Sequence, residues 1–162
     1  MAKHILIPTN YTVESLNLLK GRLEKKSEIK ESVPYHIHFV TGYHRGDSIR
    51  DLLLLSETDI INKIKDPAFN EACDIIKNKY PHLIEQFSYE IFSNYFQEGF
   101  NHFLKSNDIS EIYYSNQKLK HKNNNVFDLT KYIKRCNVIC YEIYIEKPIN
   151  FQTKGLLAQF FT

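Results

Sequence analysis

The residues best placed to contact a ligand are Pro8-Thr9-Asn10-Tyr11, directly after the first apolar run of the chain. That run, His4–Ile7, predicts a strand, and the helical spacing of apolar residues beyond it predicts a helix. A strand that leads at once into a helix is typical of the first βα unit of a parallel sheet. Because open α/β sheets bind ligands at such turns, this turn is a candidate binding element.

Three histidines have a spacing that metal sites use. His36 and His38 share one face of a predicted strand, and His44 follows in the next loop. Two histidines on a strand, with a third ligand from a loop, could hold zinc. No HExxH motif, carboxylate cluster or cysteine pair accompanies them, so we interpret them as partly buried, hydrogen-bonded histidines and predict no metal site.

The sequence carries no recognisable catalytic machinery. Cys136 and Cys140 lie four apart across a helix–strand junction, whereas redox pairs usually form C-x-x-C at a helix N-terminus. We therefore interpret them as buried packing residues. A G-x-S-x-G elbow and a paired-carboxylate arrangement are both missing from the sequence. We predict that the protein has no catalytic residues and is not an enzyme.

A basic cluster lies in the polar loop Ser115–Asn125. It comprises Lys118, Lys120, His121 and Lys122. Lysines can hold phosphate as point charges, which would favour a phosphate-bearing ligand. The simpler interpretation, a solvated loop kept soluble by its charges, is preferred here, and phosphate binding stays as the alternative.

Length and composition limit the classes of protein that fit. The 162 residues suit one domain, and 43% hydrophobic with 25% charged residues is ordinary for a globular protein. A net charge of +2 favours no nucleic-acid partner, and no apolar run reaches membrane-spanning length. Met1–His4 lacks the pattern of a signal peptide, and the three cysteines are sparse. We predict a cytoplasmic location.

The remaining periodicity predicts alternating strands and helices. Helix starts are expected at Thr12, at Ser48, at Asp66, near Asn94 with Gln97 in a capping-box relation, and at Asp128. The expected strands are His4–Ile7, Tyr35–Thr41, Ile84–Phe92, Glu111–Tyr114 and Val138–Ile145. This order predicts an α/β fold of three layers, with helices on both faces of a five-stranded parallel sheet of strand order 3-2-1-4-5.

Three segments resemble the universal stress protein family. Ile5–Asn10, with Ser15 and Leu16 beyond it, is similar to the family's opening strand, Pro-Thr-Asp turn and first helix. Ile37–Val40 is similar to the end of its second strand, and Cys136–Cys140 to the start of its last strand. The resemblance spans residues 3–145. It implies the same fold for a domain of residues 1–146, followed by a tail of residues 147–162.

The resemblance also shows where a nucleotide site has changed. Family members that bind ATP carry a glycine-rich stretch after the fourth strand, whose backbone amides approach the phosphates. The corresponding residues here, from Ser115 to Asp128, include no glycine. Asp128 replaces a hydroxyl residue, and Asn10 replaces an aspartate that contacts the nucleotide. These changes imply a degenerate nucleotide site.

The last strand suggests a partner. Val138–Ile145 is long, apolar and expected at an edge of the sheet, and an exposed edge of that kind needs a cover. Family members dimerise through this strand, so we expect a homodimer. The tail would pack on its own sheet or on the dimer partner.

Two functions are compatible with the sequence. The first is a non-catalytic regulatory or binding role in stress response, without a cofactor. The alternative is the binding of an adenine nucleotide (ATP or AMP), or of another small ligand, in the cleft at the ends of strands one and four. The candidate cleft residues are Pro8, Thr9, Asn10, Tyr11, Val40, Thr41, Ser115, Asn116, Gln117, Lys118 and Asp128.

Overall fold

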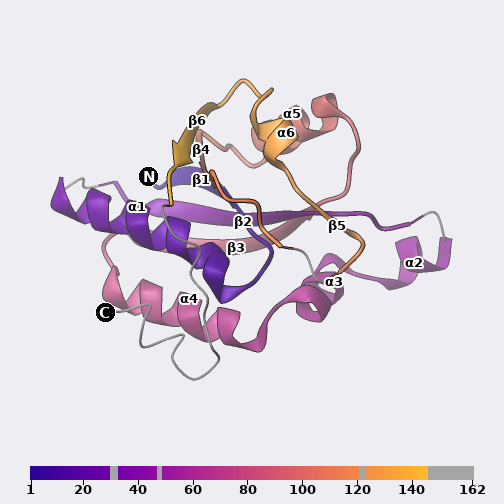
Figure 1. Ribbon diagram of the computed structural model, residues 1–162, viewed down its shortest axis with the longest axis horizontal. Coiled ribbons are helices and arrows are strands. Elements are labelled where there is room, and N and C mark those ends of the chain that lie inside the picture. Colours follow the sequence, from indigo (N-terminus) through magenta and orange to yellow (C-terminus); the bar gives the residue numbers. More distant parts are fainter. Residues whose placement is uncertain (30–32, 47–48, 121–122, 146–162) are drawn as a thin grey trace.

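A parallel sheet forms the centre of the protein (Figure 1). The computed structural model describes residues 1–29, 33–46, 49–120 and 123–145. The strand order β3-β2-β1-β4-β6 confirms the predicted order, with β6 as the fifth predicted strand. The strands are β1 (Lys3–Pro8), β2 (Tyr35–Tyr43), β3 (Ile84–Phe92), β4 (Glu111–Ser115), β5 (Val126–Phe127) and β6 (Ile139–Ile143).

Helices cover both faces of the sheet, as predicted. In Figure 1, α1 and α4 lie on one side of the sheet, and α5 and α6 lie on the other. The helices are η1 (Val13–Leu16, a 3-10 turn), α1 (Asn17–Glu28), α2 (Ile49–Leu54), α3 (Glu57–Ile64), α4 (Pro67–Lys79), α5 (Gln97–Ser106) and α6 (Thr130–Ile133). Among the described residues, no helix is both long enough and apolar enough to cross a membrane.

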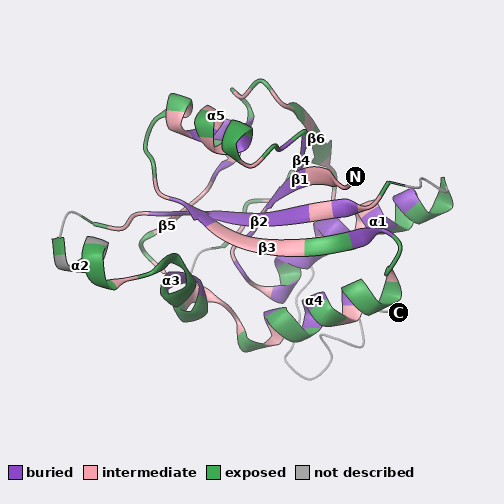
Figure 2. Ribbon diagram, turned by 180° about the vertical axis from the view of Figure 1, so that it is seen from behind, coloured by how far each residue is buried: buried purple, intermediate pink, exposed green. Residues whose placement is uncertain are grey.

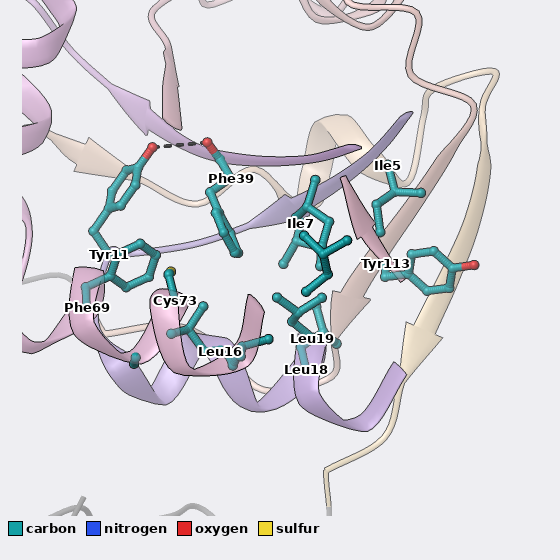
Figure 3. Packing of buried hydrophobic residues seen from close by; sticks show 14 of the residues in the cluster. Ile5, Ile7, Tyr11, Leu16, Leu18, Leu19, Phe39, Phe69, Cys73 and Tyr113 are labelled. Atoms are coloured by element: carbon teal, nitrogen blue, oxygen red, sulfur yellow. Dashed lines mark hydrogen bonds between the residues drawn. The ribbon is translucent and has the colours of Figure 1, made fainter. Parts of the chain in front are cut away.

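Alternation along the strands divides the core into two layers. Ile5 and Ile7 point to the side of α1 and α4, where they join Leu19 and Phe69 (Figure 3). Leu6, between them, belongs to the second layer under α5 and α6. Because successive residues of a strand face opposite sides, a strand covered on both faces is expected to be mostly apolar. The central strands are accordingly the most deeply buried part of the sheet (Figure 2).

The sheet contains one strand that the sequence did not predict. The two residues of β5, Val126 and Phe127, pair antiparallel with Tyr43 and Gly42 at the end of β2. Gly42 is required there, because a Cβ atom would lie only 2.4 Å from the Phe127 ring and 2.6 Å from its carbonyl oxygen. The sheet is therefore six-stranded, with a parallel centre and a short antiparallel addition.

Two of the predicted helix caps are wrong. The Thr12 side chain makes no capping bond, and its amide and hydroxyl instead donate to Asn10 Oδ1. The helix predicted near Asn94 begins at Gln97, and Asn94 Oδ1 accepts the amide of Phe96 in the turn before it. In both places a side chain satisfies the backbone of a turn that precedes the helix.

Other helix starts agree with the pattern, and one was missed. Asp66 caps α4 by accepting the Ala68 amide, and Pro67 is the first helical residue, as predicted. α3 was not predicted, although Ser56 and Asp59 form a reciprocal capping box that the S-x-x-D spacing could have indicated.

The last strand is shorter than predicted. The observed strand β6, Ile139–Ile143, replaces the expected Val138–Ile145 and pairs parallel with β4. The predicted tail, residues 147–162, lies outside the described residues.

Candidate functional site

A cavity of about 200 Å³ opens at the carboxyl ends of β1, β2 and β4. The chain leaves β1 toward β2 and leaves β4 toward β6, on opposite sides, so this is the switch point of the sheet, where open α/β sheets bind ligands. Nine of the eleven predicted cleft residues line it. They are Pro8, Thr9, Asn10, Val40, Thr41, Ser115, Gln117, Lys118 and Asp128.

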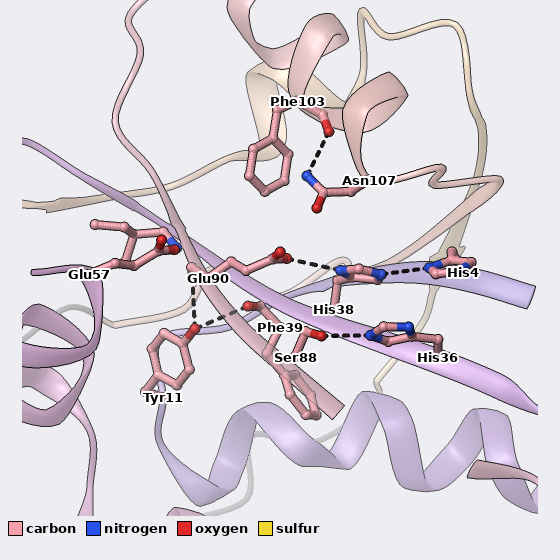
Figure 4. Close-up of polar contacts among 11 residues, drawn as sticks. His4, Tyr11, His36, His38, Phe39, Glu57, Ser88, Glu90, Phe103 and Asn107 are labelled. Carbon is pink, nitrogen blue, oxygen red and sulfur yellow. Dashed lines mark hydrogen bonds and ion pairs between the residues drawn. The ribbon is translucent and has the colours of Figure 1, made fainter. Parts of the chain in front are cut away.

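Tyr11 and Asn116 do not line the cavity, which corrects the prediction. Tyr11 has a φ of 58° and is fully buried among core residues, packed edge-on against Phe69 (Figure 3). Its hydroxyl lies 3.0 Å from the Phe39 carbonyl and 2.8 Å from the Glu90 carbonyl (Figure 4). Burial raises the pKa of Tyr11 well above its ordinary value. Asn116 instead accepts the Ile145 amide through its side-chain oxygen.

Hydroxyl groups satisfy one another within the turn after β1. The Tyr11 amide donates to Thr9 Oγ1 over 2.9 Å, and Ser15 Oγ donates to the Thr12 carbonyl over 2.7 Å. Since the Ser15 hydrogen is used in that bond, the 2.7 Å contact between Thr9 and Ser15 has Thr9 as its donor. The two buried hydroxyls therefore hold the shape of the turn.

The side chain of Asn10 joins this turn to the loop after β4. Its Nδ2 donates to the Lys120 carbonyl over 2.7 Å, while its Oδ1 accepts from the amide and hydroxyl of Thr12. An aspartate could make only the second set of bonds, because a carboxylate has no hydrogen to donate. The bond to the Lys120 carbonyl therefore requires an amide at position 10, and the sequence alone did not reveal this requirement.

The glycine-free loop after β4 is held by its own side chains. Ser115 Oγ accepts the Gln117 amide over 3.0 Å, and Gln117 Nε2 donates to the Ile145 carbonyl over 3.1 Å. Lys118 and Lys120 line the cavity, whereas His121 and Lys122 of the predicted basic cluster lie outside the described residues.

Acidic groups balance these lysines. Glu14 and Asp128 also line the cavity, so its described walls carry two potential positive and two potential negative charges. Asp128 was predicted to cap a helix, but the N-cap of that helix is Leu129; Asp128, one residue earlier, accepts the Thr130 amide over 2.6 Å. That helix, α6, is only four residues long.

One polar atom in the wall lacks a hydrogen-bond partner. Thr41 is 1% exposed, and its Oγ1 makes no hydrogen bond to any described residue. A buried hydroxyl left unpaired costs about 1–3 kcal/mol, so a ligand group that bonded to it would recover that energy. Thr41 is therefore the lining residue with the clearest reason to contact a ligand.

The histidines assemble differently from the sequence prediction. His36 and His38 share one face of β2 and are hydrogen-bonded, as predicted, to Ser88 and Glu90. His44 lies apart from them, with its ring stacked on Phe127 at 4.4 Å. His4 of β1 lies beside His36 instead, because the parallel register pairs these two residues.

The cysteine pair is less buried than predicted. Cys136 and Cys140 are both partly exposed, and their sulfur atoms lie 3.4 Å apart without a disulfide bond. Burial and the neighbouring Cys136 thiol raise the pKa of Cys140 to about 12. A thiol with that pKa is a poor nucleophile at neutral pH.

Comparisons with known proteins give structural matches. Protein-family models and curated proteins yield no match. The hypothetical protein MJ0577 matches with a TM-score of 0.50 and 16% identity, over 91% of this chain and 99% of that one. Universal stress protein UspA from Lactobacillus plantarum matches with a TM-score of 0.50 and 13% identity, over 87% and 97%.

A further match is a universal stress protein in complex with cAMP, with a TM-score of 0.48 and 8% identity over 87% of this chain and 96% of that one. The strand order and the two helical layers agree with what the sequence resemblance implied. The chain thus has the fold of the universal stress proteins.

Proposed function

We propose that this chain is a non-catalytic regulatory protein of the universal stress type, and that a small ligand binds in the cleft at the ends of β1 and β4. The observation that carries the proposal is the convergence of nine predicted residues around one cavity at the switch point of the sheet. The fold it shares with UspA supports a role in stress response. The unpaired Thr41 hydroxyl supports the presence of a ligand.

The size and charge of the cleft favour a nucleoside or nucleoside monophosphate over a triphosphate. Its volume of about 200 Å³ is below the roughly 300–1,000 Å³ of typical small-molecule sites. Lys118 and Lys120 are balanced by Glu14 and Asp128, so the described walls offer no excess positive charge to a polyphosphate.

The loop chemistry supports the same size limit. No glycine lies between Ser115 and Asp128, so side chains occupy the places where backbone amides would approach phosphates. The Asp128 carboxylate already accepts the Thr130 amide, and it would repel an anion placed there. A degenerate ATP site that keeps room for a smaller ligand accounts for both observations.

The composition of the walls supports a non-catalytic role. The lining residues within the described ranges include no histidine or cysteine. The hydroxyls of Thr9 and Ser15 bond to each other and to backbone groups, so neither is activated by a base. The cleft is therefore suited to recognition.

Thermal unfolding with adenosine, AMP and ATP tests the ligand. At a hundred times its dissociation constant, a bound ligand stabilises by about 2.7 kcal/mol, which is a clear shift in melting temperature. We expect saturable stabilisation by adenosine or AMP. The absence of any shift at millimolar concentration would contradict ligand binding, and ATP binding tighter than AMP binding would contradict the size limit.

A valine variant at Thr41 tests whether AMP binds in the cleft or elsewhere on the protein. Thr41→Val keeps the branched shape and removes the unpaired hydroxyl, so we expect about tenfold weaker AMP binding with no loss of fold stability. Thr58→Val, at an exposed position of α3, is the matched control and should bind AMP like the unchanged protein.

We also infer that the protein forms a homodimer through β6 and works in the cytoplasm. β6 is the last strand in the sheet order, and Ile139 and Tyr141 are 60% and 42% exposed on it. An apolar edge of this kind is a place for strand pairing with a second copy. The three free cysteines are compatible with a reducing compartment.

A further inference from the structure

Three imidazole rings from two strands converge near the start of the sheet, at the opposite end of β1 from the cleft. His4 lies directly beside His36 in the β1–β2 register, and His38 follows two residues later on the same face. One ring nitrogen from each of the three lies within 4.8 Å of the others. The ring centroids are 4.3–5.2 Å apart, so the three side chains form one compact cluster (Figure 4).

Residues of β3 hold two of these rings in place. Glu90 Oε2 lies 3.0 Å from His38 Nδ1, and Ser88 Oγ lies 2.6 Å from His36 Nε2 (Figure 4). An ionised carboxylate can only accept, so His38 carries its proton on Nδ1, and Nε2 of the neutral ring presents a lone pair. A carboxylate that orients a histidine in this way is the usual support of a metal-binding imidazole.

The cluster is also reachable from solvent. His38 is 3% exposed, but the side chains of His4 and His36 are only partly buried. An ion can therefore enter past these two rings and keep a water molecule on its open side. Zinc sites with three protein ligands likewise keep their fourth position open to a water molecule.

We propose that His4, His36 and His38 form a binding site for a divalent transition-metal ion, with Zn²⁺ as the best-suited ion. Neutral imidazole nitrogens suit zinc, copper and nickel. Zinc–nitrogen bonds of about 2.0–2.1 Å place tetrahedral ligands about 3.3 Å apart. The His4 and His38 nitrogens, 2.9 Å apart, need to separate by a few tenths of an ångström. The His36 ring, which is stacked on His38 with an angle of 14° between the ring planes, must turn out of this stack for its nitrogen to face the same ion.

Binding of the ion can be described with every ring proton accounted for. Without an ion, His4 Nδ1 donates its hydrogen to the lone pair of His38 Nε2. With an ion, His4 holds its proton on Nε2, and Nδ1 becomes a ligand beside His38 Nε2. The tautomer of His36 that donates from Nε2 to Ser88 leaves Nδ1 as the third ligand. Neutral rings therefore bind the ion without releasing a proton.

Calorimetric titration of Zn²⁺ into untagged, chelator-treated full-length protein tests the site, with the Co²⁺ absorption spectrum as an independent report of ligand geometry. We expect one ion per chain. His36→Gln removes a ligand at a partly exposed position, and we expect at least tenfold weaker binding with an unchanged circular dichroism spectrum. His82→Gln, at an exposed position outside the cluster, is the matched control and should bind like the unchanged protein.

The thiols are the competing source of zinc affinity, because Cys136 and Cys140 lie close together. A protein with both changed to serine should keep its Zn²⁺ affinity if the histidines hold the ion. Glu90→Gln should weaken binding by about 10–100-fold, since the support of His38 is then reduced. Loss of binding in the serine variant, unchanged binding in His36→Gln, or no stoichiometric binding at micromolar Zn²⁺ would each overturn the proposal.

Discussion

The amide nitrogen of Asn10 donates to the backbone carbonyl of Lys120 over 2.7 Å, which ties together two loops that lie 110 residues apart in the chain. Both residues line the cleft, so the bond joins two parts of its wall. It also explains why an amide stands where the resembling family has an aspartate. A carboxylate oxygen would face the Lys120 carbonyl oxygen, and two acceptors in contact repel.

Replacing Asn10 by aspartate should therefore loosen the loop after β4. We expect Asn10→Asp to lower the free energy of unfolding by about 1–2 kcal/mol in chemical denaturation, through the loss of one hydrogen bond and the new repulsion. Asn94→Asp is the matched control, because the Asn94 side chain accepts the Phe96 amide through its oxygen, which aspartate retains. Equal losses in the two variants would contradict a specific role for the Asn10 amide.

Several local signals in the sequence were reliable. β3 begins at Ile84 and ends at Phe92, as alternation predicted, and α4 begins after Asp66 with Pro67 first. Both patterns are written in neighbouring residues, so a single sequence suffices to read them. The convergence of most of the cleft followed from strand order, since parallel strands end at the same edge of a sheet.

Several misses depended on contacts between distant segments, whereas the Thr12 and Asn94 caps failed because of local hydrogen bonds. Tyr11 follows the cleft turn in sequence, but its positive φ accompanies a side chain that is buried in the core. β5 exists because Phe127 meets Gly42, a pairing that neither local pattern indicates. His4 joins His36 only through the β1–β2 register, which the periodicity of each strand does not fix.

Acid should destabilise the protein through Glu111, which is buried at the start of β4. Burial by itself raises the pKa of this carboxyl. The opposite effect comes from Lys3, whose Nζ lies 2.5 Å from Glu111 Oε1, and from the Tyr113 hydroxyl and Arg22. Together they outweigh burial, and the pKa of Glu111 is below its ordinary value. Because the folded pKa is the lower one, the unfolded chain takes up the proton first. This contribution to stability is complete above the unfolded pKa of about 4.3, and it is lost as the pH falls through the folded pKa.

Denaturant titrations at pH values from 3 to 7 measure this contribution. We expect the stability of Glu111→Gln to depend less on pH below about 4.3 than that of the unchanged protein. Glu71→Gln, at an exposed position of α4, is the control and should keep the full dependence. A Glu111→Gln profile parallel to that of the unchanged protein would show that the carboxyl is not the group responsible.

The proposed dimer makes a prediction about the exposed face of β6. Sedimentation velocity at micromolar concentration should detect a dimer, because Ile139 and Tyr141 leave apolar surface on an edge strand. Ile139→Lys should shift the population to monomer, since a charge on an edge strand opposes pairing. Leu53→Lys changes a residue on α2 that is 77% exposed, and it should leave the dimer intact. A monomeric unchanged protein would rule out this interface.

The Tyr11 hydroxyl provides a test of whether this residue serves the fold or the cleft. It lies within hydrogen-bond distance of the Phe39 and Glu90 carbonyls, on two neighbouring strands, so its removal leaves a buried acceptor with one partner fewer. We expect Tyr11→Phe to lower the free energy of unfolding by about 1–2 kcal/mol. Tyr144→Phe, at a residue 76% exposed, should change stability by less than about 0.5 kcal/mol.

Since the Tyr11 ring faces the core, AMP affinity should be equal in Tyr11→Phe and the unchanged protein. Weaker AMP binding with unchanged stability would contradict this role and would indicate that Tyr11 contacts the ligand, as the sequence analysis predicted.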